Sequence, residues 1–168
     1  GVVEMTTGHR RTPGADFPHL GAVTAKGLTP ETFALPSHIL VRSSPGKRNV
    51  ESEFHSAAYL GARYASLAIY DGKPPKNVDR PEWLTDAAET GRNTFREQLN
   101  QRFAGQRKTA ATEAYGFSFE QARAFVAQRD VFDLSCESQA DQERYGMSEF
   151  GRHCLLARRL LENGVPYV

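Results

Sequence analysis

The sequence is poor in cysteine and has no long apolar run. Its 168 residues contain two cysteines, Cys136 and Cys154, too few for the disulfide framework of a small secreted domain. A single disulfide and two free, partly buried thiols both remain open. No apolar segment approaches the roughly 20 residues that a membrane-spanning helix needs. The sequence therefore predicts no membrane span.

The chain also lacks an excess of one charge sign. Its 21 basic and 20 acidic residues leave a net charge of +1, and acids and bases interleave, as between residues 92 and 107. A dedicated nucleic-acid binder is usually strongly basic. The charge balance therefore predicts no nucleic-acid partner.

Common catalytic motifs are absent as well. No GxSxG, P-loop or GxGxxG motif occurs, and the histidines do not have the HxxxH or HxH spacing of a metal site. We expect structural or surface roles for the five histidines, which are His9, His19, His38, His55 and His153. The residues alone assemble no catalytic constellation.

Glycine and proline are frequent, with 14 and 9 residues, and they gather before residue 85. We expect a single α/β domain with three parts: a loop-rich part with short strands (1–84), a helical part (85–146), and a helix leading into a core strand (147–168). The apolar run 38–41 predicts a strand buried on both faces, and 65–70 predicts a second. Because the run after Gly164 reads as the start of another strand, we expect an incomplete domain, an internal piece of a longer protein.

Helical periodicity predicts several helices. In the first half of the chain, one helix ends at Gly8 and a short one spans about 20–27. In the second half, one helix begins near residue 85 and another covers about 110–128. Two more begin at capping serines: one runs from Ser135 to Tyr145, and one runs from Ser148 to Gly164. The predicted inward faces are Leu84, Ala88, Phe95, Leu99 and Phe103; Ala114, Phe117, Ala122, Phe125 and Val126; and Phe150, Cys154, Ala157 and Leu161. The charged clusters 113–123 and 137–144 are interpreted as solvated helix faces.

Three stretches carry a family resemblance. They are MTTGHRRTPGADFPHLG at residues 5–21, YLGARY at 59–64, and FDLSCE, YG, FGRHCLLARRL and GV at 132–137, 145–146, 150–160 and 164–165. Together they resemble the bacterial domain of unknown function 1501 family, which is sulfatase-like and belongs to the alkaline phosphatase superfamily. The resemblance covers nearly the whole chain. It implies a partial alkaline-phosphatase-like α/β fold, with few core strands and a mainly helical second half.

The resemblance also implies a function. Related proteins hydrolyse phosphate or sulfate esters with divalent metals, so it implies an anionic ester substrate, a Zn, Ca or Mn ion in the full-length parent, and a periplasmic or extracellular location. No metal or cofactor site is expected within these residues. Basic side chains after the nucleophile helix help to hold such a substrate. His9, Arg10 and Arg11 follow that helix, and a solvated basic loop is the competing interpretation.

One position departs from the sulfatase pattern. In sulfatases a nucleophile opens the helix that ends in Thr-Gly, with an arginine four residues later. Matched on Thr7 and Gly8, the nucleophile falls just before Gly1 and the arginine position falls on Val2. A non-catalytic binding protein that retains the fold is therefore an alternative, and a helical interaction module over 85–146 is a third. The sequence does not indicate an oligomeric state.

Overall fold

The computed structural model describes residues 1–30, 32–43, 56–70, 81–106, 109–146 and 148–168. His55 lies outside these residues. The described helices and strands are, in chain order, α1 (Val2–Thr7), α2 (Leu20–Leu28), β1 (Ile39–Arg42), η1 (Ala58–Leu60), η2 (Ala62–Tyr64), β2 (Leu67–Tyr70), α4 (Asp86–Gln106), α5 (Ala110–Ala127), η3 (Arg129–Phe132), η4 (Leu134–Cys136), α6 (Gln139–Tyr145) and α7 (Glu149–Glu162).

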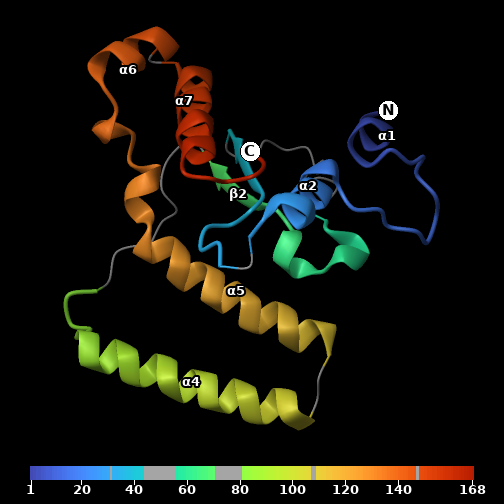
Figure 1. Ribbon diagram of the computed structural model, residues 1–168, viewed down its shortest axis with the longest axis vertical. Helices are drawn as coiled ribbons and strands as arrows, with labels where there is room; N and C mark the ends of the chain where they lie inside the picture. The colour runs from blue at the N-terminus through green and yellow to red at the C-terminus, as the bar shows by residue number, and fades with distance from the viewer. Residues whose placement is uncertain (31, 44–55, 71–80, 107–108, 147) are drawn as a thin grey trace.

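A small parallel sheet lies at the centre of the molecule (Figure 1). β1 and β2 pair in parallel, with Ile39 opposite Leu67. On the other side of β1, the backbone N–H of Ile39 donates to the carbonyl of Tyr167 over 3.0 Å. Both predicted strands are therefore confirmed, as is a mainly helical α/β fold. Burial on both faces is confirmed only in part, because Ile39 is fully buried while Leu40 and Val41 are partly exposed.

The hydrophobic core lies between the sheet and α7. It contains Leu35, Ile39, Ile69, Phe125, Phe132, Leu156, Leu160 and Val165. The ring centroids of Phe125 and Phe132 are 4.2 Å apart. This contact joins the end of α5 to the core. The core thus collects side chains from both halves of the sequence, so the strands and the later helices stabilise one another.

The predicted inward face of α7 is wrong. The helix buries Gly151, Leu155, Leu156 and Leu160, whereas Phe150 and Leu161 are 76% and 53% exposed. Two apolar stripes lie side by side on this helix, and the stripe with three leucines enters the core. Gly151 also favours this orientation, since a Cβ at this position would overlap the backbone carbonyl of Tyr145.

The helix before α7 begins later than the sequence predicts. Ser135 lies in η4, where its N–H donates to the carboxylate of Asp133 over 2.9 Å. Ser138 caps α6 by accepting from the N–H of Asp141 over 3.1 Å. The short 3-10 turn η4 and the separate helix α6 therefore replace one continuous helix. The predicted end of this helix at Gly146, with φ of 80°, and the predicted cap of α7 at Ser148 are confirmed.

The two cysteines are free. Cys136 is exposed and Cys154 is partly buried.

α4 and α5 form an antiparallel pair, with α4 at the outer edge (Figure 1). Between them, Arg96 pairs with Glu120 over 2.7 Å and Arg123 pairs with Glu97 over 3.0 Å. The charged cluster that ends at Arg123 contributes ion pairs to a helix–helix contact, while Glu120 and Arg123 stay 52% and 46% exposed, so its interpretation as a solvated face is confirmed in part.

The buried faces of α4 and α5 differ from those that the sequence predicts. The predicted stripe of α4 points outward, with Phe95, Leu99 and Phe103 exposed. On α5, Phe125 is buried as predicted, but Ala122 and Val126 are exposed. The reason is the position of α4, which lies at the outer edge beside α5 (Figure 1), so the hydrophobic core does not cover its apolar stripe.

Candidate functional site

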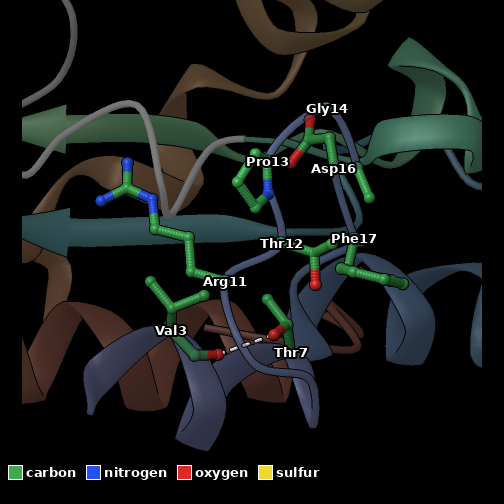
Figure 2. Close-up of a pocket in the computed structure, with 9 residues that line it drawn as sticks. Val3, Thr7, Arg11, Thr12, Pro13, Gly14, Asp16 and Phe17 are labelled. Carbon is green, nitrogen blue, oxygen red and sulfur yellow. Dashed lines mark hydrogen bonds between the residues drawn. The ribbon is translucent and has the colours of Figure 1, made fainter.

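The loop after α1 encloses the candidate site. Gly8, with φ of 72°, ends α1 in the left-handed conformation that glycine adopts easily. The loop then turns back at Gly14, and the N–H of Ala15 donates to the carbonyl of Thr12 over 3.1 Å. The result is a cavity of about 540 Å³ between α1 and the loop (Figure 2), lined by Val3, Thr7, Arg11, Thr12, Pro13, Gly14, Ala15, Asp16 and Phe17.

The three candidate residues for substrate contact take different positions. Arg11 lines the cavity. Arg10 lies on the surface with its side chain 91% exposed, and its Nε donates to Glu4 Oε1 over 3.1 Å. His9 stacks on the ring of Phe17, with centroids 4.1 Å apart and planes inclined by 12°. The structure therefore brings Arg11 to the cavity wall, while Arg10 and His9 lie beside it.

The hydroxyl groups of the cavity are already occupied as donors. Thr7 Oγ1 donates to the carbonyl of Val3 over 2.7 Å, and Thr12 Oγ1 donates to the carbonyl of Arg10 over 3.2 Å. Asp16 accepts from Ser56 Oγ over 2.7 Å, which ties the loop to a distant part of the sequence. Arg11 and Asp16 are thus the two side chains that bring formal charge to the wall, with opposite signs.

The described residues do not fit a metal site. In the part of the chain that the structure describes, no three side chains of histidine, cysteine, aspartate or glutamate come together. Divalent zinc needs at least three such ligands in a catalytic site. The divalent metal that the family resemblance implies would have to be held by other residues.

Two buried histidines meet beneath α2. His19 and His38 are 4% and 1% exposed, and their rings stack with centroids 5.5 Å apart. Tyr167 contacts both rings edge-on. His19 Nδ1 also accepts from the N–H of Gly21 over 3.1 Å and caps α2. These positions agree with the structural role expected for the two residues.

Comparison with known proteins assigns the chain to a family. The model of the family described as "Protein of unknown function (DUF1501)" matches residues 1–168. The chain belongs to this family. No curated protein and no solved structure matches the chain. Among the described residues, no helix has both the length and the apolar character that crossing a membrane requires.

This DUF1501 chain also contains an ionic cluster that the sequence did not predict. Glu137, whose side chain is 9% exposed, accepts from Arg158 Nη2 over 3.1 Å and from Arg159 Nη1 over 2.6 Å. Arg159 Nε donates further to the carbonyl of Val131 over 2.8 Å. The interpretation of 137–144 as a solvated face is therefore wrong for Glu137. The nearest signal was the acid-rich segment followed by paired arginines on the next helix.

Asp141 completes the ionic cluster. Arg158 Nη1 donates to Asp141 Oδ1 over 3.0 Å. This hydrogen bond is the main reason that the pKa of Asp141 lies below its ordinary value, and the bond from Ser138 adds to the effect. The same pairing raises the pKa of Arg158. The cluster fastens α6 and η4 to α7, so it serves the fold and lies on elements separate from the cavity beside α1.

Proposed function

We propose that the chain is part of an exported, sulfatase-like hydrolase of phosphate or sulfate esters, in which the loop 9–17 contacts the anionic group. One observation carries this proposal: an arginine lines an open cavity directly after a helix that ends in Thr7 and Gly8. The guanidinium group binds phosphate and sulfate oxygens through two parallel N–H bonds. The three sequence stretches that resemble sulfatase-like proteins support the same class of substrate.

The charges on the cavity wall determine how strongly the cavity is expected to bind an anion. Arg11 attracts an anion, and the carboxylate of Asp16 repels it. The hydroxyl protons of Thr7 and Thr12 already bond to backbone carbonyls, so these two groups contribute little as donors. Arg10 lies on the surface beside the loop and pairs with Glu4, so it adds little net positive potential. In this proposal Arg11 positions the substrate and Asp16 limits its affinity.

The chemical step belongs to residues other than those described. The resemblance implies a nucleophile just before Gly1 and a divalent metal, Zn, Ca or Mn, in the parent. Such a metal polarises the ester oxygens and activates the nucleophile when bound. An exported location follows from the same resemblance and is part of the proposal.

Turnover by the full-length protein tests the proposal. The assay uses p-nitrophenyl phosphate and p-nitrophenyl sulfate with Zn, Mn or Ca added in turn. We expect turnover of one ester, and a loss of roughly tenfold or more in kcat/KM for Arg11→Ala, because one charge-assisted contact is removed. The matched control is Arg92→Ala, which removes an exposed arginine on α4. Absence of turnover with every metal contradicts the proposal.

A non-catalytic binding protein is the second candidate. The observation that favours it is Val2, which stands where the sulfatase pattern has arginine. This candidate predicts that the full-length protein binds inorganic phosphate or sulfate through Arg11 but turns over neither ester. The same assay, combined with calorimetric binding, distinguishes the two functions.

A further inference from the structure

The wall of the cavity beside α1 carries one formal charge of each sign. Arg11 brings the positive charge, Asp16 brings the negative charge, and the other described lining residues are uncharged. Figure 2 shows the Arg11 side chain extending away from the loop, while the carboxylate of Asp16 lies on the side of Pro13. Arg10 and Glu4, beside the cavity, pair with each other over 3.1 Å. An anion in the cavity therefore meets one attractive group and one repulsive group at separate positions.

Ser56 holds the carboxylate of Asp16 in this position. Its Oγ donates to Asp16 Oδ2 over 2.7 Å and accepts from the N–H of Ala58 over 3.0 Å. The carbonyl of Ser56 also accepts from the N–H of His19 over 3.3 Å. One residue, 40 positions along the chain from Asp16, thus binds the end of the loop at two points. The negative charge of Asp16 is therefore a fixed part of the cavity wall.

The backbone next to Ser56 is strained. Ala58 has a φ of 45°, in the left-handed region that favours glycine over alanine. Such strain persists where surrounding contacts hold the backbone, and it occurs most often at functional positions. The bond from the N–H of Ala58 to Ser56 Oγ is one of these contacts. The strain thus lies directly beside the hydroxyl that orients Asp16, which favours a role for Ser56 in the site.

The charge of a ligand decides how well this wall accepts it. A sulfate monoester or a phosphodiester carries one negative charge, whereas a phosphate monoester carries about two at pH 8. The free-energy cost of taking an ion out of water rises with the square of its charge, but its attraction to one guanidinium rises only in proportion to that charge. Arg11 can therefore compensate a single negative charge. A second one has no counterpart among the described lining residues and is repelled by Asp16.

The size of the cavity favours an ester over an inorganic ion. Its volume of about 540 Å³ lies within the range of small-molecule sites and exceeds what one tetrahedral anion fills. Val3, Pro13 and Phe17 give the wall apolar surface. This surface can contact the organic group of an ester while the anionic group lies against Arg11.

We infer that the cavity beside α1 selects esters that carry a single negative charge, with Ser56 as the positioning residue that holds the opposing carboxylate of Asp16 on the wall. The inference rests on the proposed function and narrows its substrate class to sulfate monoesters or phosphodiesters. Ser56 acts through Asp16, because its hydroxyl proton is donated to that carboxylate.

Calorimetric titration of the full-length protein at pH 8, without added metal, tests the inference. The probes are methyl sulfate and dimethyl phosphate, which carry one charge, and methyl phosphate, which carries about two. We expect at least one singly charged probe to bind more tightly than methyl phosphate by roughly threefold or more. Tighter binding of methyl sulfate than of dimethyl phosphate indicates a sulfate ester, and the reverse order indicates a phosphodiester. Either order supports the inference.

Variants test the two residues separately. Asp16→Asn removes a repulsion that grows in proportion to ligand charge, so the gain in affinity for methyl phosphate should be about the square of the gain for methyl sulfate. Ser56→Ala releases the carboxylate and should reduce the preference among the probes, and Ser56→Thr, which keeps the hydroxyl, should restore it. The control is Asp130→Asn, which removes an exposed charge on η3 and should leave the preference unchanged. Circular dichroism checks that each variant stays folded.

The outcomes distinguish this inference from the proposed function. A wild type that binds methyl phosphate as tightly as the other probes overturns the inference and leaves the anion site intact. So does an Asp16→Asn variant with the wild-type preference. A Ser56→Ala variant that changes the affinity for all three probes equally shows a merely structural role and overturns the positioning role of Ser56. Absence of binding by all three probes contradicts the anion site itself, and the inference falls with it.

Discussion

Gly21 of α2 lies directly against the imidazole ring of His38. A Cβ atom built at position 21 would overlap Nε2, Cε1 and Cδ2 of that ring. His38 is 1% exposed and precedes β1. The absence of a side chain at Gly21 therefore sets how closely α2 approaches the sheet.

Replacing Gly21 with alanine should destabilise the fold. The added methyl group must displace the His38 ring, which is packed against His19 and Tyr167. We expect the free energy of unfolding to fall by about 1–3 kcal/mol, as for other overpacked sites. Urea unfolding followed by circular dichroism measures it.

The matched control is Gly27→Ala on the same helix. A Cβ at Gly27 meets nothing within 4 Å. This variant should stabilise the helix by about 0.5–1 kcal/mol, because alanine loses less backbone entropy on folding. Equal effects at the two positions would show that the His38 contact does not limit the packing of α2.

Removing the charge of Glu137 should loosen α7 from η4 and α6. Glu137→Gln leaves Arg158 and Arg159 without their shared carboxylate in a partly buried environment. We expect a loss of about 1–3 kcal/mol in the free energy of unfolding. Glu143→Gln, on the exposed face of α6, is the control, with an expected change within about 0.5 kcal/mol. A Glu137→Gln variant as stable as the wild type would contradict the structural role of the cluster.

Asp141 should make stability depend on acid pH. Its pKa lies below the ordinary value of 3.8 in the folded state, chiefly because Arg158 donates to it. The folded state therefore binds this proton less readily than the unfolded state. The stabilisation is complete above about pH 5, well above the unfolded pKa, and is lost as the pH falls through the lower, folded pKa.

Urea unfolding between pH 2 and 6 checks this dependence, with Asp141→Asn as the comparison. The difference in unfolding free energy between the wild type and the variant should be constant above about pH 5 and shrink below about pH 3.8. A difference that stays constant over the whole range would show that the pairing with Arg158 does not lower the pKa.

Local signals in the sequence predicted much of the fold. Gly8, Gly146 and Ser148 mark helix ends by their own conformational and capping preferences, and these positions are confirmed. The apolar run at 38–41 likewise predicted β1. Such features depend on residues close in sequence, which a single sequence shows directly.

The orientation of the helices could not be predicted in the same way. On α7, two neighbouring apolar stripes compete, and only the packing against the sheet selects Leu156 and Leu160. On α4, Arg96 pairs with Glu120, 24 positions along the chain, and Phe95 stays exposed because the core does not reach this helix. The cavity wall at Arg11 likewise depends on a loop that folds back on α1. These outcomes follow from contacts between distant residues, which periodicity does not contain.

Anion binding at the cavity beside α1 tests the central claim most directly. Calorimetric titration with inorganic phosphate and sulfate is compared among the wild type, Arg11→Ala and Asp16→Asn. The Asp16→Asn variant keeps an acceptor for Ser56 while it removes the negative charge, so we expect it to bind more tightly by roughly threefold or more. Arg11→Ala should bind more weakly by roughly tenfold. Opposite shifts in the two variants support an ester-anion site. Equal affinity in all three proteins, or no binding, would contradict it.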